Sequence, residues 1–183
     1  MADAVTATPA ASVILMRGEP FEVLMIRRAA KSSFVPDAWV FPGGSVDEAD
    51  RRATELETMR VAAARELREE AGIGIDPDEL VWTSRWITPE GLPKRFDTYF
   101  FLARAPEGVE AVIDEHEAVD VVWVTPARAI EELDIVFPTM KNLEAIGGFT
   151  SIDELLASRR GADIQPTRPR LLMVGGKRTI VLP

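Results

Sequence analysis

The apolar residues of this chain fall first into short runs and later into a period of about four. The runs Ser12–Arg17 and Phe21–Arg28 consist largely of Val, Ile, Leu and Met, and the turn-forming residues Gly18-Glu19-Pro20 separate them. This pattern predicts a β-hairpin. From Thr54 to Ala71 the chain is rich in Ala, Leu, Glu and Arg, with apolar residues every four positions. This period predicts a helix, and Gly72 follows it where a helix C-cap would lie.

The same two patterns predict the remaining strands and helices. We expect strands at Trp39–Phe41, Glu79–Thr88, Phe96–Ala105 and Val119–Thr125, and two short ones around Gly175-Gly176. We expect helices at Ala127–Leu133, with Pro126 at its start, at Pro138–Ile146 and at Ile152–Arg160. The order predicts an α+β (α/β) fold, a mixed β-sheet between helices with additional C-terminal helices. We expect residues 1–11 to form a loose arm and residues 12–183 a single domain.

Composition and charge exclude several kinds of site and partner. The 183 residues are 46% hydrophobic and 28% charged, which is typical of a folded globular protein. The chain has no cysteine, which excludes disulfides, thiolate zinc sites and cysteine nucleophiles. A net charge of −9 argues against nucleic acid as a partner. The first apolar run, Val13–Met16, is too short to span a membrane, so we expect a soluble cytoplasmic protein with no membrane partner.

Three carboxylates gather near the end of the predicted helix. Glu66 lies three and four positions before Glu69 and Glu70, so all three side chains can reach one side of a helix. They repel one another and lie at the end of the helix where the dipole disfavours anions. Such a cluster favours a divalent cation, and carboxylate oxygens indicate Mg²⁺ or Mn²⁺. The alternative is a solvated acidic face with Arg65 and Arg68 as partners.

A glycine turn precedes this helix. In the segment Phe41-Pro42-Gly43-Gly44 a predicted strand ends in two glycines, which let the backbone approach a bulky anion closely. Alone, the segment would be read as an ordinary β-turn. Together, a glycine turn and a carboxylate helix indicate a site for a metal-bound diphosphate.

These residues resemble the Nudix box, G-x5-E-x7-R-E-U-x-E-E-x-G-U, where U is aliphatic. The run from Arg65 to Ile73 matches its second half at every fixed position, and Glu57 falls seven residues before Arg65. Twelve residues separate Gly44 from Glu57 where the box has five. The sequence is therefore Nudix-like over residues 43–73, with a seven-residue insertion within 45–56.

The chain is also similar to the Nudix branch of coenzyme A diphosphatases typified by the mammalian peroxisomal enzyme. The segments that carry this similarity are Trp39–Asp47, Trp86–Pro89, Arg95–Leu102 and the C-terminal Ile180–Pro183. The separate coenzyme A signature is matched only in part. Leu24, Arg28 and Ala29 fit it, whereas Ser33 and Asp37 stand where Arg and Gly are expected.

The resemblance implies metal-dependent hydrolysis of a nucleoside diphosphate linked to another moiety, such as CoA or acyl-CoA cleaved to 3′,5′-ADP and (acyl-)4′-phosphopantetheine. It implies Glu66, Glu69 and Glu70 as ligands of Mg²⁺ or Mn²⁺, and Arg65 as the residue that holds the glycine loop through a carboxylate. That carboxylate is Glu57, with Glu55 and Glu48 as alternatives. The general base is left open among Glu66, Glu69, Glu70 and a carboxylate of a later loop. Glu117 is the candidate in that loop, and a solvated acidic turn is the alternative interpretation of it.

The remaining substrate contacts are candidates with open alternatives. Gly43, Gly44, Arg28, Arg95 and Trp86 are the proposed substrate-binding residues, with Trp86 stacking on adenine; the cations are equally typical of a solvated surface. Other substrates consistent with the box are ADP-ribose, NADH and dinucleoside polyphosphates. A non-catalytic nucleotide sensor is an alternative of another class. The additional helices would cap the substrate or form a homodimer interface.

Overall fold

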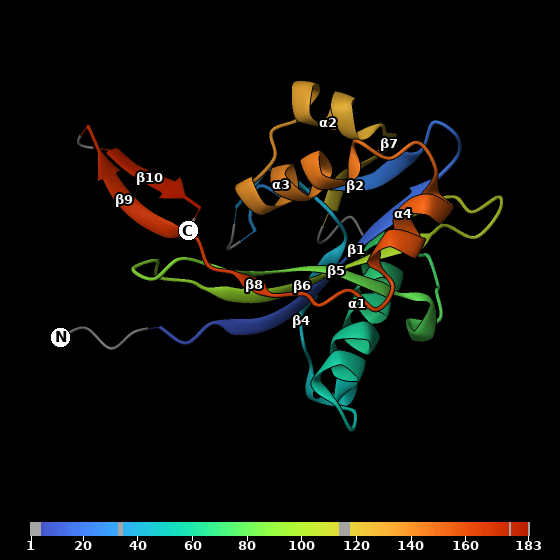
Figure 1. Ribbon diagram of the computed structural model, residues 1–183, viewed down its shortest axis with the longest axis horizontal. Helices are drawn as coiled ribbons and strands as arrows, with labels where there is room; N and C mark the ends of the chain where they lie inside the picture. Colours follow the sequence, from blue (N-terminus) through green and yellow to red (C-terminus); the bar gives the residue numbers. More distant parts are fainter. Residues whose placement is uncertain (1–4, 33–34, 114–117, 176, 183) are drawn as a thin grey trace.

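The structure, a computed structural model, describes residues 5–32, 35–113, 118–175 and 177–182 (Figure 1). In this part of the chain eight strands form one sheet and two form a separate hairpin. The sheet contains β1 (Thr8–Arg17), β2 (Glu22–Arg28), β3 (Trp39–Val40), β4 (Gly43–Ser45), β5 (Val81–Ile87), β6 (Phe96–Arg104), β7 (Ala118–Val124) and β8 (Pro166–Thr167). The hairpin contains β9 (Arg170–Val174) and β10 (Lys177–Val181). The helices are α1 (Glu55–Ala71), α2 (Pro126–Glu132), α3 (Phe137–Ile146) and α4 (Ile152–Arg159), with short 3₁₀ helices η1 (Glu48–Asp50) and η2 (Pro77–Glu79).

Strand β1 organises the sheet because it pairs with three neighbours. It runs parallel to β6 from Thr8 to Met16 and antiparallel to β2 at Met16 and Arg17. Its first half pairs with β4, where Ala11 lies opposite Gly44. The sheet order is β3-β2-β1-β6-β5-β8, with β7 on β2. The glycine segment therefore lies against the central strand as a short strand of its own.

Helices cover both faces of this sheet. Helix α1 lies on one face, and α2, α3 and α4 lie on the other (Figure 1). Strand β1 contributes Ile14 to the core on the side of α3 and α4, and Val13 and Leu15 to the core under α1. Its continuous apolar run is thus explained, since successive strand residues point to opposite buried faces. The predicted class, a mixed sheet between helices, is confirmed.

Helix α1 has sequence signals at both ends. Thr54 precedes it, and its hydroxyl accepts a hydrogen bond from the Glu57 backbone N–H at 3.2 Å. The Glu57 carboxylate in turn accepts from the Thr54 backbone N–H at 2.9 Å, which completes a capping box. Gly72 ends the helix in the left-handed conformation at φ 69°. The predicted helix is confirmed within one residue.

The structure corrects the predicted N-terminal arm. Strand β1 begins at Thr8, so residues 8–11 belong to the sheet rather than to a loose arm. The apolar run alone could not reveal this, because these residues are held by backbone pairing with β4 and β6. Strands β4 and β8 were also not predicted, since their Gly and Pro residues are typical of turns. In the described residues, none of the helices combines the length and apolar character that crossing a bilayer requires.

We expect Phe101→Ala to destabilise the protein by about 3–5 kcal/mol, because Phe101 is fully buried in the core under α1. Urea unfolding of the two proteins measures this difference. The control is Val119→Ala, at a position that is 45% exposed, which should change the free energy of unfolding by less than about 0.5 kcal/mol. An equal loss of unfolding free energy in both variants would contradict a core on each face of the sheet.

Candidate functional site

The site is built where strand β4 meets helix α1. The backbone N–H of Gly43 donates a hydrogen bond to Glu70 Oε2 at 2.7 Å. A Cβ atom at Gly44 would lie 2.5 Å from Glu66 Oε1, closer than such atoms approach in proteins. The two carboxylates stand one helical turn apart and both face the glycine strand. At Gly43 a Cβ atom would meet the backbone of Ala11 and Ser12, so glycine is needed there for the close pairing of β4 with β1.

Arg65 joins this helix to the loop before it. Its Nε donates to Asp50 Oδ1 at 3.0 Å and its Nη2 donates to Asp50 Oδ2 at 2.9 Å. Nη2 also donates to the Ser45 carbonyl at 2.9 Å, while Nη1 donates to Glu66 Oε1 at 2.9 Å and to Glu69 Oε2 at 2.8 Å. One guanidinium therefore connects η1, β4 and two carboxylates of α1.

The hydrogen bonds of this network shift the pKa values of Arg65 and Asp50. The hydrogen bond with Asp50 is the main cause that raises the pKa of Arg65. Burial raises the pKa of Asp50, whose side chain is only 2% exposed. The hydrogen bonds from Arg65 and the Asp47 backbone outweigh burial, so the pKa of Asp50 lies below its ordinary value of 3.8. Both groups are therefore held in their charged forms at neutral pH.

The partner of Arg65 differs from the one expected. The resemblance implies Glu57, with Glu55 and Glu48 as alternatives, whereas the structure places Asp50 against Arg65. Glu57 is at the start of α1, where it caps the helix. The insertion supplies the carboxylate, and several acidic residues within it made the choice impossible from spacing alone.

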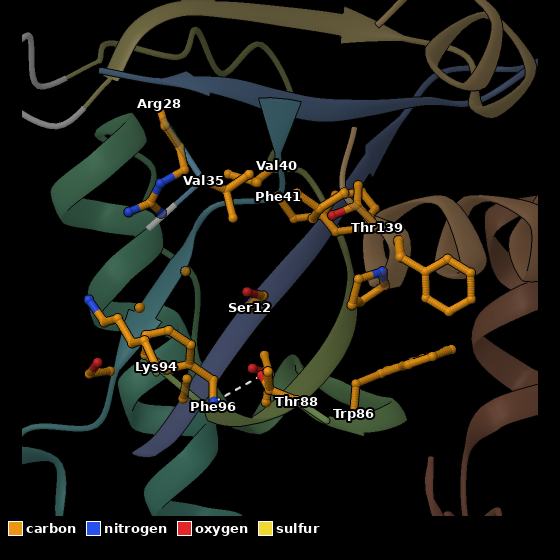
Figure 2. Close-up of a pocket in the computed structure, with 18 of the residues that line it drawn as sticks. Ser12, Arg28, Val35, Val40, Phe41, Trp86, Thr88, Lys94, Phe96 and Thr139 are labelled. Carbon is orange, nitrogen blue, oxygen red and sulfur yellow. Dashed lines mark hydrogen bonds between the residues drawn. The ribbon is translucent and has the colours of Figure 1, made fainter. Parts of the chain in front are cut away.

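Next to these carboxylates the protein has a cavity of about 880 Å³. Gly43, Gly44, Glu66 and Glu70 line one part of it. The cations that line it are Arg28, Lys31 and Lys94, and its apolar lining includes Trp86, Phe96, Phe137, Pro138, Pro169 and Ile180. In Figure 2, Arg28 and Lys94 lie on one side and Trp86 and Thr139 on the other, with Ser12 between them. The cavity therefore combines a charged side with an apolar one.

Helix α3 forms part of the apolar side. The rings of Trp86 and Phe137 meet edge to face with 6.1 Å between their centroids. The buried Asn142 fixes the helix against β5, since it donates to the Pro138 carbonyl at 2.8 Å and accepts from Ser84 Oγ at 2.6 Å. One of the additional helices, α3, therefore lines the cavity through its first turn.

The structure brings together some of the predicted site residues and separates others. Arg28, Trp86, Gly43 and Gly44 line the cavity with Glu66 and Glu70. Arg95 donates instead to the carbonyls of Thr88 at 3.0 Å and Val5 at 2.6 Å, and lies outside the cavity lining that the described residues define. Glu69 is 53% exposed and paired with Arg65. Glu117 lies outside the described residues.

Sequence reasoning missed Asp50 and the residues of α3 that line the cavity. Asp50 accepts from the Asp47 backbone N–H at 2.8 Å, but nothing in the sequence distinguishes it from the other acidic residues of the insertion. No pattern in the sequence relates the first turn of α3 to residues of β5 that lie more than fifty positions earlier.

The carboxylates at this site suit a hard divalent cation, because carboxylate oxygens are the ligands that Mg²⁺ and Mn²⁺ prefer. The close packing of Glu66 against Gly44 and the bond between Glu70 and Gly43 fix two of them beside the cavity. Among the described residues, no three Asp, Glu or His side chains are already arranged to hold a metal ion together. The Glu69 carboxylate is paired with Arg65 instead of joining those of Glu66 and Glu70.

Comparison with known proteins identifies a family. The NUDIX domain model matches residues 6–143. Nudix hydrolase 7 of Caenorhabditis elegans is 28% identical over 158 residues, covering 67% of this chain and 53% of that protein. The m7GpppN-mRNA hydrolase NUDT17 of Danio rerio is 31% identical over 125 residues (61% and 39%), and the acyl-coenzyme A diphosphatase NUDT19 of Xenopus laevis is 34% identical over 55 residues (30% and 14%). The chain thus spans about half the length of the first of these relatives.

The fold also matches solved structures. A NUDIX hydrolase from Alicyclobacillus acidocaldarius superposes with a TM-score of 0.73 at 23% sequence identity, covering 84% of this chain and 96% of that one. At this identity the likeness concerns the fold alone.

We expect Asp50→Asn to lower the free energy of unfolding by about 2 kcal/mol at pH 7, because it removes a buried charge partner of Arg65. The contribution of Asp50 is complete above its ordinary pKa of 3.8 and is lost as the pH falls through the lower folded-state value. Urea unfolding at a series of pH values should therefore show the two proteins converging below about pH 4.

The matched control is Glu57→Gln, which removes the other candidate carboxylate but keeps a side chain able to form the capping box. It should change the free energy of unfolding by less than about 0.5 kcal/mol. If Glu57→Gln had the larger effect, Asp50 would not be the partner that stabilises Arg65.

Proposed function

This chain belongs to the Nudix family, and from that membership we propose that it is a metal-dependent hydrolase that cleaves a diphosphate between a nucleoside and another moiety. The observation that carries the proposal is the placement of Glu66 and Glu70 against the glycines of β4, beside a cavity of about 880 Å³. A cavity of this size suits a small-molecule substrate.

Glu66, Glu69 and Glu70 would hold the divalent cation, Mg²⁺ or Mn²⁺. A cation bound there would neutralise the anhydride oxygens and lower the pKa of a bound water. Glu66 and Glu70 already lie beside the cavity, whereas Glu69 would exchange its contact with Arg65 for the cation. Arg65 keeps its two bonds to Asp50 and its bond to the Ser45 carbonyl, so the glycine strand stays in position.

The cations that line the cavity would hold the anionic substrate. Arg28 is itself oriented, because its Nε and Nη2 both donate to Ser32 Oγ, at 3.1 and 2.7 Å. Lys31 and Lys94 add two further positive charges to the lining. In a protein of net charge −9, these local cations are needed to attract a polyanion. Trp86 would contact the adenine.

The proton of the attacking water would pass to Glu69, to Glu66 or to the later Glu117.

We propose CoA or acyl-CoA as the substrate, cleaved to 3′,5′-ADP and (acyl-)4′-phosphopantetheine. Its support is the resemblance to coenzyme A diphosphatases and the local similarity to the acyl-coenzyme A diphosphatase of Xenopus laevis. The three cations in the cavity lining suit a substrate with a phosphate in addition to its diphosphate. The coenzyme A signature is incomplete at Ser33 and Asp37, so the substrate requires a direct assay.

The assay is product identification by mass spectrometry with Mg²⁺ and with Mn²⁺. The panel contains CoA, an acyl-CoA, NADH, ADP-ribose, a dinucleoside polyphosphate and an mRNA cap analogue. We expect CoA or acyl-CoA to yield 3′,5′-ADP. Cleavage of another member alone would contradict the CoA assignment and leave the hydrolase proposal standing. No cleavage with either metal would favour a non-catalytic nucleotide-binding protein.

We expect Glu69→Gln to lower kcat by at least ~10² while the fold is kept, because it removes a charged ligand from an exposed position. Steady-state kinetics and thermal unfolding measure the two effects. The control is Glu131→Gln on α2, an exposed glutamate away from the cavity lining, which should leave kcat unchanged. A fully active Glu69→Gln protein would remove Glu69 from the metal site.

A further inference from the structure

The C-terminal hairpin is separate from the main sheet and exposes apolar side chains. Strands β9 and β10 pair only with each other among the described strands. The hairpin extends beyond the main sheet, on the same side of the molecule as the start of β1 (Figure 1). Leu172, Met173, Ile180 and Leu182 are all exposed. A contiguous group of exposed apolar residues is typical of a surface that binds something.

The hairpin borders the cavity through one strand and a smaller groove through the other. Ile180 of β10 lines the cavity that contains Glu66 and Glu70, whereas Leu171, Leu172 and Met173 of β9 line a small groove beside Glu90. Ile180 lies opposite Leu171, so these two side chains share a face of the hairpin, and Thr179 and Leu172 share the other. The two-residue strand period places Met173 and Leu182 on the face of Ile180. This apolar face therefore consists of Leu171, Met173, Ile180 and Leu182.

That face borders the apolar side of the cavity at Ile180. Strand β8 pairs with β5 at Arg85 and Trp86, and the chain then passes through Pro169, another lining residue, into the hairpin. A path of apolar residues thus runs from Trp86 along Pro169 to Ile180. A molecule held by its diphosphate at Glu66 and Glu70 would have this path open to its other end.

We infer that the apolar face of the hairpin binds an extended apolar group on the substrate, such as an acyl or alkyl chain, and thereby selects for substrates that carry one. The inference rests on the proposed function, because the diphosphate must occupy the carboxylate side of the cavity. The cavity itself, at about 880 Å³, is near the upper end of ligand sites and has room for more than a diphosphate.

The test measures binding and does not depend on hydrolysis. Hydrolysis-resistant, methylene-bridged alkyl diphosphates with two, six and ten carbons are titrated into the whole protein with Mg²⁺ by calorimetry. Burial of a methylene group is worth a factor of about four in affinity. We therefore expect affinity to rise at least ~10-fold from two to ten carbons.

The variants are Ile180→Ser and its matched control Leu172→Ser, at two exposed positions on opposite faces of one hairpin (36% and 48% exposed). Ile180→Ser should reduce the gain with chain length at least ~3-fold, and Leu172→Ser should keep it. Light scattering on the same samples reports oligomeric state. No gain with chain length would overturn the inference, as would equal losses in both variants or a dimer that Ile180→Ser dissociates.

Failure of this inference is distinct from failure of the proposed function. Chain-length-dependent binding without cleavage of CoA or acyl-CoA would support the hairpin site and contradict the proposed substrate. Cleavage of CoA together with equal affinity for all three probes would support the proposed substrate and contradict the hairpin site.

Discussion

Arg65 is the side chain through which the parts of the site are held in register. Its guanidinium binds Asp50 from η1, the Ser45 carbonyl at the end of β4, and Glu66 and Glu69 of its own helix. The Arg65 side chain is half-buried, and anions and a carbonyl satisfy its donors. Because these partners come from three elements, a movement of any one of them would disturb the carboxylates beside the cavity.

The sheet supplies the second constraint. Strand β4 pairs with β1, which is itself parallel to β6, so the glycines are fixed to the centre of the fold. Helix α1 packs on the same strands through its apolar face. The distance between Gly43 and Glu70 is therefore set by core packing as well as by the hydrogen bond between them. Glycine is required at Gly43 because a Cβ atom there would meet the backbone of Ala11 and Ser12 in β1.

The other elements shape the cavity. Helix α3 brings Phe137 against Trp86, and the buried Asn142 ties this helix to β5. The C-terminal hairpin adds Ile180 to the same lining. Charge gathers near the carboxylates and apolar surface near α3 and the hairpin, a division that suits a molecule with a polyanionic part and an apolar part. The elements outside the Nudix box thus line the apolar part of the cavity, whereas the box supplies the carboxylates beside it.

The sequence by itself determined the local features. The helix that ends at Gly72, the run from Arg65 to Ile73 and the apolar strands were all predicted, because each depends on residues near one another in the chain. The partner of Arg65 was not readable, because the choice of Asp50 over Glu57 depends on how a loop folds back onto α1. The sequence also did not predict that residues 8–11 pair with β4 and β6. It did not predict that Trp86, Phe137 and Ile180 line one cavity. Tertiary structure decided these, since contacts between distant segments leave no periodic signal in the sequence.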